Sequence, residues 1–375
     1  MKVSSLATPA CLIDRSRFMA NVARMQQTSL DSGLAWRPHV KTLKSLDAAR
    51  YYAPVTEPIA VSTIAEARAF ANAGYEDILY AVGLSPDKYQ FIDSIQSDKT
   101  ALTVVIDSLA SAQTLAQNNE ISQMLNVMIE LDADGCRAGV DPSATELITI
   151  ASTLVAAPRL CFRGLMVYAG GAYGCTSMED IRRLASIEAD KANIAKQALE
   201  QAGIACDVVS LGSTPTAMSR TSGATASEVR TGVCVTMDMT MADLGVCAVD
   251  DIAISVLTSV IGYRHDKNWL IVDAGWMAMS SDQGAHGLSK GYGLVADIQG
   301  NVIPGLMLSS MNQEHGIVTC ADNAVLPDAL RAPGTKLRII PNHACATATN
   351  FPCYHLVDGG EYTGEKWQRL PRGWT

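Results

Sequence analysis

The stretch Arg37-Pro38-His39-Val40-Lys41-Thr42 governs how most of this chain is interpreted. Proline at 38 pushes Arg37 out of the helical region, so the stretch begins extended. Lys41 then follows at the start of a short polar segment. A lysine at the end of a buried strand is costly unless it has a partner or a chemical role. Lys41 is therefore a candidate reactive amine, and a surface lysine at a strand end is the alternative.

Working outward from this stretch, short apolar runs alternate with helical patterns up to about residue 212. Predicted strands lie at residues 10–13, 59–62, 77–82, 102–107, 125–132, 160–168 and 207–212, and the intervening segments show helical spacing. Together with the stretch around Lys41 they make about eight strand-then-helix units, which predict a parallel sheet covered on both faces. The count favours a (β/α)8 TIM barrel over an open doubly wound sheet. No GxGxxG follows the first strand, which weakens a dinucleotide-binding interpretation.

After about residue 240 the pattern changes to β-rich segments without a long amphipathic helix. These segments are residues 252–262, 269–273, 292–297, 317–320 and 336–340, and short turns join some of them. We expect two domains, an α/β barrel over residues 10–240 and a mostly antiparallel β domain over residues 241–375. The β domain is expected to include residues 1–9, because they precede the first predicted barrel strand.

The composition excludes several classes of protein. The net charge is -9 and no basic stripe is present, which argues against nucleic acid or an anionic membrane as a partner. No apolar run reaches the roughly 18 residues of a membrane span, and the N-terminus lacks a signal-peptide hydrophobic region. The ten cysteines are scattered without a CxxC pair, as expected of reduced thiols in a cytoplasmic protein.

In a barrel, functional side chains gather where the strands end. The polar residues at predicted strand ends are Lys41, Ser62, Thr63, Asp107, Asp132, Arg137, Tyr168 and the run Gly212-Ser213-Thr214-Pro215-Thr216. Backbone N–H groups and hydroxyls of Ser213 and Thr214 suit a single phosphate, and an ordinary helix-capping turn is the alternative. Thr231-Gly232-Val233 offers a second set of backbone donors, which we place near a strand start.

Arg137 lies in the glycine-bracketed loop Asp134-Gly135-Cys136-Arg137-Ala138-Gly139. Its planar guanidinium suits a phenolate or carboxylate oxygen. A surface salt bridge with Asp132 or Asp134 is an equally good interpretation of this loop.

Pro341-Asn342-His343-Ala344-Cys345 carries the second candidate site. In an extended segment residues two apart face the same side, so His343 and Cys345 are expected to grip one ion. Imidazole and thiolate together suit zinc, and two protein ligands leave positions open for substrate, as in catalytic metal sites. A buried polar pair is the alternative.

Taken together, these stretches resemble the fold-type III pyridoxal phosphate enzymes, within them the D-threonine aldolase and D-serine dehydratase group. The resemblance spans nearly the whole chain through residues 37–42, 134–140, 212–216, 273–275, 313–316 and 341–345. Residues 273–280 and the final Gly373-Trp374 are similar to the bacterial D-threo-3-hydroxyaspartate dehydratase branch. The resemblance implies an alanine-racemase-like barrel with a β domain, and a homodimer.

The resemblance also implies roles for individual residues. Lys41 would carry pyridoxal 5'-phosphate as a Schiff base and then act as the catalytic base, and a divalent metal, most consistent with Zn2+, would face it. Cofactor contacts would come from Arg137 at the phenolic oxygen, Tyr168 and Tyr173 at the ring, and Ser213, Thr214, Gly232 and Val233 at the phosphate. His343 and Cys345 would bind the metal.

The metal motif favours one reaction over another. Aldolases of this group tend to carry a histidine and an aspartate there, whereas the dehydratases show PNHxC, as this chain does. We therefore expect a lyase that eliminates water from a D-β-hydroxy amino acid, D-threo-3-hydroxyaspartate or D-serine, giving a 2-oxo acid and ammonia. A metal-dependent D-threonine aldolase, giving glycine and an aldehyde, is the alternative. A non-catalytic cofactor carrier or a racemase fits less well, because neither needs the metal pair.

Overall fold

The computed structural model describes residues 2–220, 225–284, 291–321 and 324–375. Two compact units make up the chain. One contains Met1–Ala23 and Val233–Pro371, and the other contains Arg24–Gly232 with the last four residues, Arg372–Thr375. The division falls within the first long helix, α1 (Arg15–Ser32).

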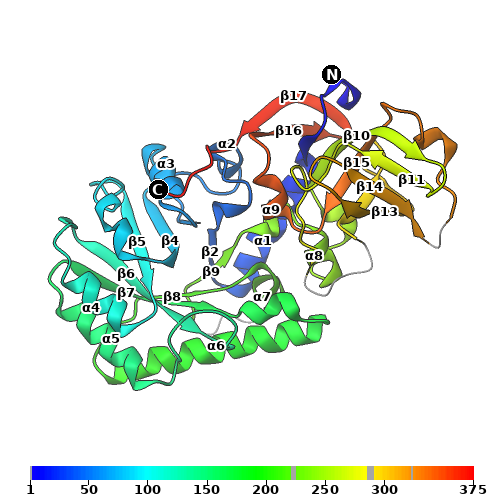
Figure 1. Cartoon of the computed structure of the whole chain (residues 1–375). Coiled ribbons are helices and arrows are strands. Elements are labelled where there is room, and N and C mark those ends of the chain that lie inside the picture. The colour runs from blue at the N-terminus through cyan, green and yellow to red at the C-terminus, as the bar shows by residue number, and fades with distance from the viewer. Residues whose placement is uncertain (1, 221–224, 285–290, 322–323) are drawn as a thin grey trace. The chain divides into compact units, whose positions relative to one another are not determined.

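The unit containing Lys41 is an eight-stranded parallel barrel (Figure 1). Its strands are β2 (Ala35–Pro38), β3 (Ile59–Val61), β4 (Asp77–Gly83), β5 (Ala101–Ile106), β6 (Leu125–Asp132), β7 (Leu160–Tyr168), β8 (Val208–Leu211) and β9 (Glu228–Thr231). Neighbours in the sequence pair in parallel from β3 to β9, and β9 pairs with β2. A single parallel bridge between His39 and Ala60 joins the ends of β2 and β3, so the barrel is nearly closed.

Helices follow most of these strands and cover the barrel. They are α2 (Leu46–Ala49), α3 (Ile64–Asn72), α4 (Leu109–Ala116), α5 (Thr145–Ala156), α6 (Met178–Gln201) and α7 (Thr214–Ser219). Figure 1 shows α6 running along the outside of β7 and β8. Hydroxyl side chains that accept a backbone N–H begin five of these helices, at Ser45, Thr63, Ser108, Ser177 and Ser213. The predicted (β/α)8 architecture is therefore confirmed.

The other unit is built on a nine-stranded sheet. Its strands are β1 (Ala10–Asp14), β10 (Ile254–Arg264), β11 (Trp269–Val272), β12 (Gly293–Ala296), β13 (Val302–Met311), β14 (Gly316–Cys320), β15 (Lys336–Pro341), β16 (Cys353–Asp358) and β17 (Glu361–Gln368). Six of them close into an antiparallel ring in the order β10-β11-β14-β13-β12-β15. β1, β16 and β17 extend the sheet from β10. The predicted antiparallel β domain is present.

The segment at residues 10–13 does not begin the barrel, contrary to the sequence-based expectation. As β1 it pairs antiparallel with β10 and parallel with β16. Four of its five residues are buried, and a run buried on both faces suits a central strand of either sheet, so its pattern could not decide between them. The strand that completes the barrel is instead β9, which the sequence did not predict as a strand.

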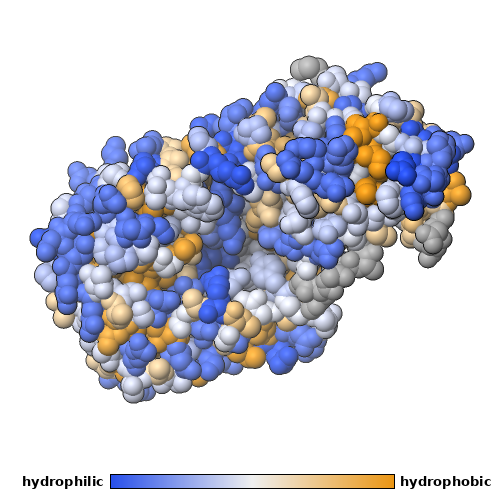
Figure 2. All heavy atoms as spheres, viewed as in Figure 1, coloured by the Kyte–Doolittle hydropathy of each residue, from blue (hydrophilic) through white to orange (hydrophobic). Residues whose placement is uncertain are grey.

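The surface of the barrel unit seen in Figure 2 is mostly hydrophilic, with small hydrophobic areas. The barrel interior contains a cluster of buried apolar side chains from five consecutive strands, Ala60, Leu79, Val105, Met128 and Met166. Among the described residues, no helix is both long enough and apolar enough to cross a membrane.

Gly164 supplies a test of the barrel packing. It lies within β7 at φ +142°, and a Cβ built there would lie 1.9 Å from the carbonyl oxygen of Val208 on β8. Gly164→Ala is expected to lower the free energy of unfolding by at least about 3 kcal/mol, because strain and a backbone clash add together. Urea unfolding followed by circular dichroism measures this change.

Gly174→Ala is the matched control, because no described atom beyond its own chain neighbours lies within 4 Å of a Cβ built at Gly174. It is expected to change the free energy of unfolding by less than about 1 kcal/mol. Equal stabilities of the two variants would contradict the close β7–β8 approach.

Candidate active site

Lys41 lies just past the carboxyl end of β2, in a short 3-10 turn (Val40–Thr42). The residue before this turn, His39, accepts the Lys41 backbone N–H at its Nδ1, at 3.4 Å. Burial and the nearby cations Lys41, Arg230 and Lys44 lower the pKa of His39 well below its ordinary value. The imidazole therefore stays neutral and can accept this bond. The Lys41 side chain itself is exposed.

Three neighbouring strands bring the predicted lysine and phosphate residues to one edge of the barrel. β2, β9 and β8 are adjacent and parallel, so their carboxyl ends meet. Lys41 follows β2, Gly232 follows β9, and Ser213 with Thr214 follows β8. A Cβ built at Gly232 would lie 3.5 Å from Lys41 Cε. Thr231-Gly232-Val233 thus comes at a strand end, and the predicted position near a strand start was wrong.

Ser213 caps the short helix α7, as the capping alternative predicted. Its Oγ accepts the Thr216 N–H, and its own N–H donates to Thr216 Oγ1 at 3.2 Å. The hydroxyl of the neighbouring Thr214 takes no part in this helix cap. Thr214 is 1% exposed, and its Oγ1 has no hydrogen-bond partner within the part of the chain that the structure describes. A buried hydroxyl without a partner is costly, so Thr214 has capacity for a polar ligand.

Arg137 follows β6 and is already engaged by two neighbours. Its Nη2 pairs with Glu130 Oε1 at 2.6 Å, and its guanidinium stacks 3.9 Å from the centroid of the Tyr168 ring. Asp132 and Asp134 instead accept backbone N–H groups of the same loop. Arg137 therefore pairs with Glu130 of β6, and not with Asp132 or Asp134, which were the expected alternatives.

Tyr168 ends β7, and burial raises the pKa of its hydroxyl, with Arg137 opposing that shift. Tyr173, the other predicted ring residue, lies in the 3-10 segment Gly170–Gly174 after the same strand. Both tyrosines come from the loop region that follows β7, two strands from β9 in the barrel order.

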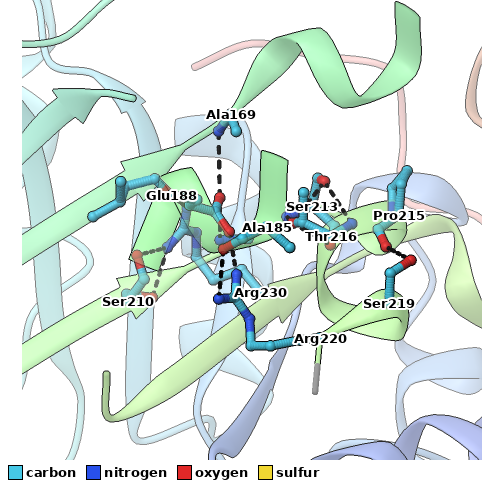
Figure 3. A network of polar contacts seen from close by, with 12 residues as sticks. Ala169, Ala185, Glu188, Ser210, Ser213, Pro215, Thr216, Ser219, Arg220 and Arg230 are labelled. Carbon is cyan, nitrogen blue, oxygen red and sulfur yellow. Dashed lines mark hydrogen bonds and ion pairs between the residues drawn. The ribbon is translucent and has the colours of Figure 1, made fainter. Parts of the chain in front are cut away.

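A buried glutamate that was not predicted from the sequence holds two of these loops (Figure 3). Glu188 on α6 accepts the backbone N–H of Ala169 after β7 and that of Gly212 after β8, and it pairs with Arg220. Burial raises the pKa of Glu188, and Arg220 opposes the shift. The one available signal was an acidic residue on the alanine-rich buried face of α6.

His343 and Cys345 form the second candidate site, in the other unit. His343 is extended and precedes α9 (Ala344–Ala348), so Cys345 lies inside a helix. The expected alternation of an extended segment was therefore wrong, yet the two side chains still meet in a hydrogen bond. Cys345 and Asp282 raise the pKa of His343 to about 9. Among the described residues, no group of three or more His, Cys, Asp or Glu side chains is arranged as a metal site.

Both units match domains of known protein families. Residues 13–240 match the alanine racemase N-terminal domain, and residues 253–357 match a serine dehydratase domain. The chain is 44% identical to D-threo-3-hydroxyaspartate dehydratase of Delftia sp. (strain HT23) over 99% of this chain and 98% of that one. It is 28% identical to D-serine dehydratase of Dictyostelium discoideum, covering 95% and 94%. A cysteine-to-alanine variant of D-threo-3-hydroxyaspartate dehydratase, solved in a metal-free form, matches with TM-score 0.94, 42% identity and full coverage of both chains.

The partly buried His39 predicts a pH dependence of stability. Its pKa is lowered in the folded state, so below about pH 6.5 the unfolded chain binds a proton that the folded chain does not. Stability is therefore lost as the pH falls, by about 1.4 kcal/mol per pH unit from this group. His39→Asn keeps an acceptor for the Lys41 N–H and is expected to show a slope shallower by about one proton.

Urea unfolding between pH 7 and pH 5 measures the two slopes. His265→Asn removes an exposed histidine and is the control, expected to keep the wild-type slope. A His39→Asn slope equal to that of the wild type would show that His39 is protonated in the folded protein.

Proposed function

The chain belongs to the family in which an alanine racemase N-terminal domain is joined to a serine dehydratase domain, and from this we infer that it is a lyase that dehydrates a D-β-hydroxy amino acid. The products are a 2-oxo acid and ammonia. One observation carries the proposal: Lys41, Gly232 and Thr214 follow three adjacent parallel strands and so share one barrel edge. The candidate substrates are D-threo-3-hydroxyaspartate, as named for the 44% identical relative, and D-serine.

The barrel edge fits pyridoxal 5'-phosphate. The unpartnered Thr214 hydroxyl, with Ser213 and the backbone of Gly232 and Val233, would hold the phosphate, and Gly232 leaves room beside Lys41. Arg137 would meet the phenolic oxygen, and Tyr168 and Tyr173 would flank the ring. When bound, the cofactor supplies an electron sink for the bond that breaks at Cα.

Lys41 is the residue to which we assign both cofactor attachment and proton transfer. Its side chain is exposed on the carboxyl edge, where an amine can leave the cofactor and take the Cα proton of the substrate at Nζ. The neutral His39 holds the Lys41 backbone by accepting its N–H. Glu188 fixes the loops after β7 and β8. The two tyrosines and the residues proposed to bind phosphate therefore keep their positions relative to the strands.

The hydrogen-bonded pair of His343 and Cys345 fits a divalent metal, which we propose to be Zn2+, because imidazole and thiolate are donors that zinc prefers. A metal held by His343 and Cys345 would supply positive charge that makes hydroxide a better leaving group. Elimination then leaves an enamine, and its hydrolysis gives the 2-oxo acid and ammonia. The PNHxC motif supports this reaction over aldol cleavage.

Two other assignments stay predictions. One is the cytoplasmic location, which rests on ten scattered cysteines without a CxxC pair. The homodimer implied by the family resemblance can be tested by light scattering of the purified protein.

Lys41→Ala tests the cofactor assignment. Borohydride reduction of the wild type with bound pyridoxal phosphate is expected to fix the cofactor covalently on the peptide that contains Lys41. The Lys41→Ala variant is expected to show no attachment by mass spectrometry and to lose at least about a thousandfold in ammonia release, because the base is missing. The control Lys99→Ala removes an exposed lysine and is expected to match the wild type. Attachment at another lysine would contradict the assignment.

Product analysis with and without metal tests the reaction. Treatment with a chelator is expected to abolish ammonia release from D-threo-3-hydroxyaspartate and D-serine, and added Zn2+ is expected to restore it. Cofactor absorbance should survive the same treatment, because the metal ligands are separate from the cofactor residues. Glycine and an aldehyde as products would instead identify an aldolase, and activity that resists the chelator would contradict the metal role.

A further inference from the structure

The imidazole of His343 is held on its Nδ1 side by a carboxylate. Asp282 Oδ2 lies 2.8 Å from His343 Nδ1. An imidazole has two nitrogens, so a ring whose Nδ1 is engaged by a carboxylate presents Nε2 to a metal. In metal sites, a partner of this kind fixes the tautomer and orientation of the ligating histidine and makes it a stronger donor.

We propose that Asp282 is the positioning residue of the metal site, an inference that rests on the proposed function. Its carboxylate accepts the Nδ1–H of His343 and turns the ring so that Nε2, together with Cys345 Sγ, binds one divalent cation. Asp282 acts through His343 and does not itself bind the metal.

Asp282 is fixed from three directions, as an orienting group must be. Its N–H donates to Ser280 Oγ at 3.0 Å, and its Oδ1 accepts the Gly284 N–H at 2.8 Å. Its backbone carbonyl accepts from the Nδ2 of Asn342, the residue before His343, at 3.3 Å. The segment that carries the carboxylate is thereby tied to the segment that carries the two ligands.

The backbone of the ligand segment is fixed separately. Asp238, which is 2% exposed, accepts the Ala344 N–H at 2.9 Å and the Met241 N–H at 3.0 Å. Since the main chain at His343 is already set, the freedom that remains is the rotation of its ring, and Asp282 restricts that rotation. The Asp282 side chain is 46% exposed, so its replacement is expected to leave the fold intact.

Metal affinity of the full-length protein, with pyridoxal phosphate bound, tests the proposal directly. Zn2+ competition against a chromogenic chelator is expected to show affinity about 10- to 100-fold lower in Asp282→Ala than in the wild type. Asp282→Asn is expected to lie between them, because an amide oxygen still accepts the Nδ1–H without the negative charge. Asp266→Asn, at an exposed carboxylate of the same unit that pairs with Arg264, is the control and is expected to bind as the wild type does.

Cobalt spectra separate a positioning residue from a ligand. With Co2+ in place of Zn2+, Asp282→Asn is expected to keep the wild-type thiolate charge-transfer band and d–d bands, because His343 and Cys345 remain the ligands. A changed d–d spectrum would make Asp282 a ligand, and an unchanged zinc affinity in Asp282→Ala would remove its role; either result overturns the proposal. A wild type whose zinc affinity matches that of the His343→Ala, Cys345→Ala double variant would instead contradict the metal site of the proposed function.

Discussion

The barrel depends on a buried arginine, Arg37, at the start of the stretch that carries Lys41. Its guanidinium forms a bidentate pair with Asp77 on β4, at 2.8 and 3.0 Å, and its Nε donates to Glu228 on β9 at 2.7 Å. Burial alone would lower the pKa of Arg37, and the two carboxylates more than reverse that shift, so the charge is kept. The Arg37–Glu228 pair is buried on both sides, and removing one partner of such a pair typically costs about 3–5 kcal/mol, because the other charge is left uncompensated. The position of β2, and with it the place of Lys41, is therefore set by electrostatics as well as by backbone pairing.

The same ion network continues toward the functional edge. Glu228 also accepts the hydroxyl of Ser210 on β8. Arg230 on β9 donates to the Ser210 carbonyl at 2.6 Å (Figure 3). It also donates to the Val167 carbonyl on β7 at 2.9 Å. Each of these strands leads into a loop that bears a proposed cofactor contact. The buried charges of Arg37, Glu228 and Arg230 thus hold β2, β7, β8 and β9 in register. In the proposed function, the ends of these strands would present the phosphate site, the ring site and the Lys41 amine to one cofactor molecule.

The alternating strands and helices of the barrel could be predicted from the sequence. The features that depend on pairing between distant segments, such as β9 and the sheet to which β1 belongs, could not. Strands β6 and β7 were predicted with their observed bounds, because each is a long and mostly apolar run. β9 was missed because its four residues, Glu228–Thr231, include two charges that are buried only because Arg37 and Ser210 come from other strands. β1 was assigned to the wrong sheet, since burial on both faces does not identify the partner. Lys41, His343 and Cys345 were proposed from motifs, whereas Glu188 and Asp282 act through partners 19 or more residues away in sequence, and no motif marks them.

In the proposed function the two units would supply different kinds of chemistry, and the contacts that hold their candidate residues differ accordingly. The barrel edge needs an amine free to change partners, and the structure leaves the Lys41 side chain exposed while fixing its backbone through His39. A metal ligand needs the reverse, because a donor that moves loses affinity and geometry. His343 accordingly has its ring held by Asp282, and the backbone beside it is held by Asp238. In the proposed function, selection between elimination and aldol cleavage would fall to the unit with the rigid donors, since both reactions begin with an amine and a cofactor and differ in which bond at the β-carbon breaks.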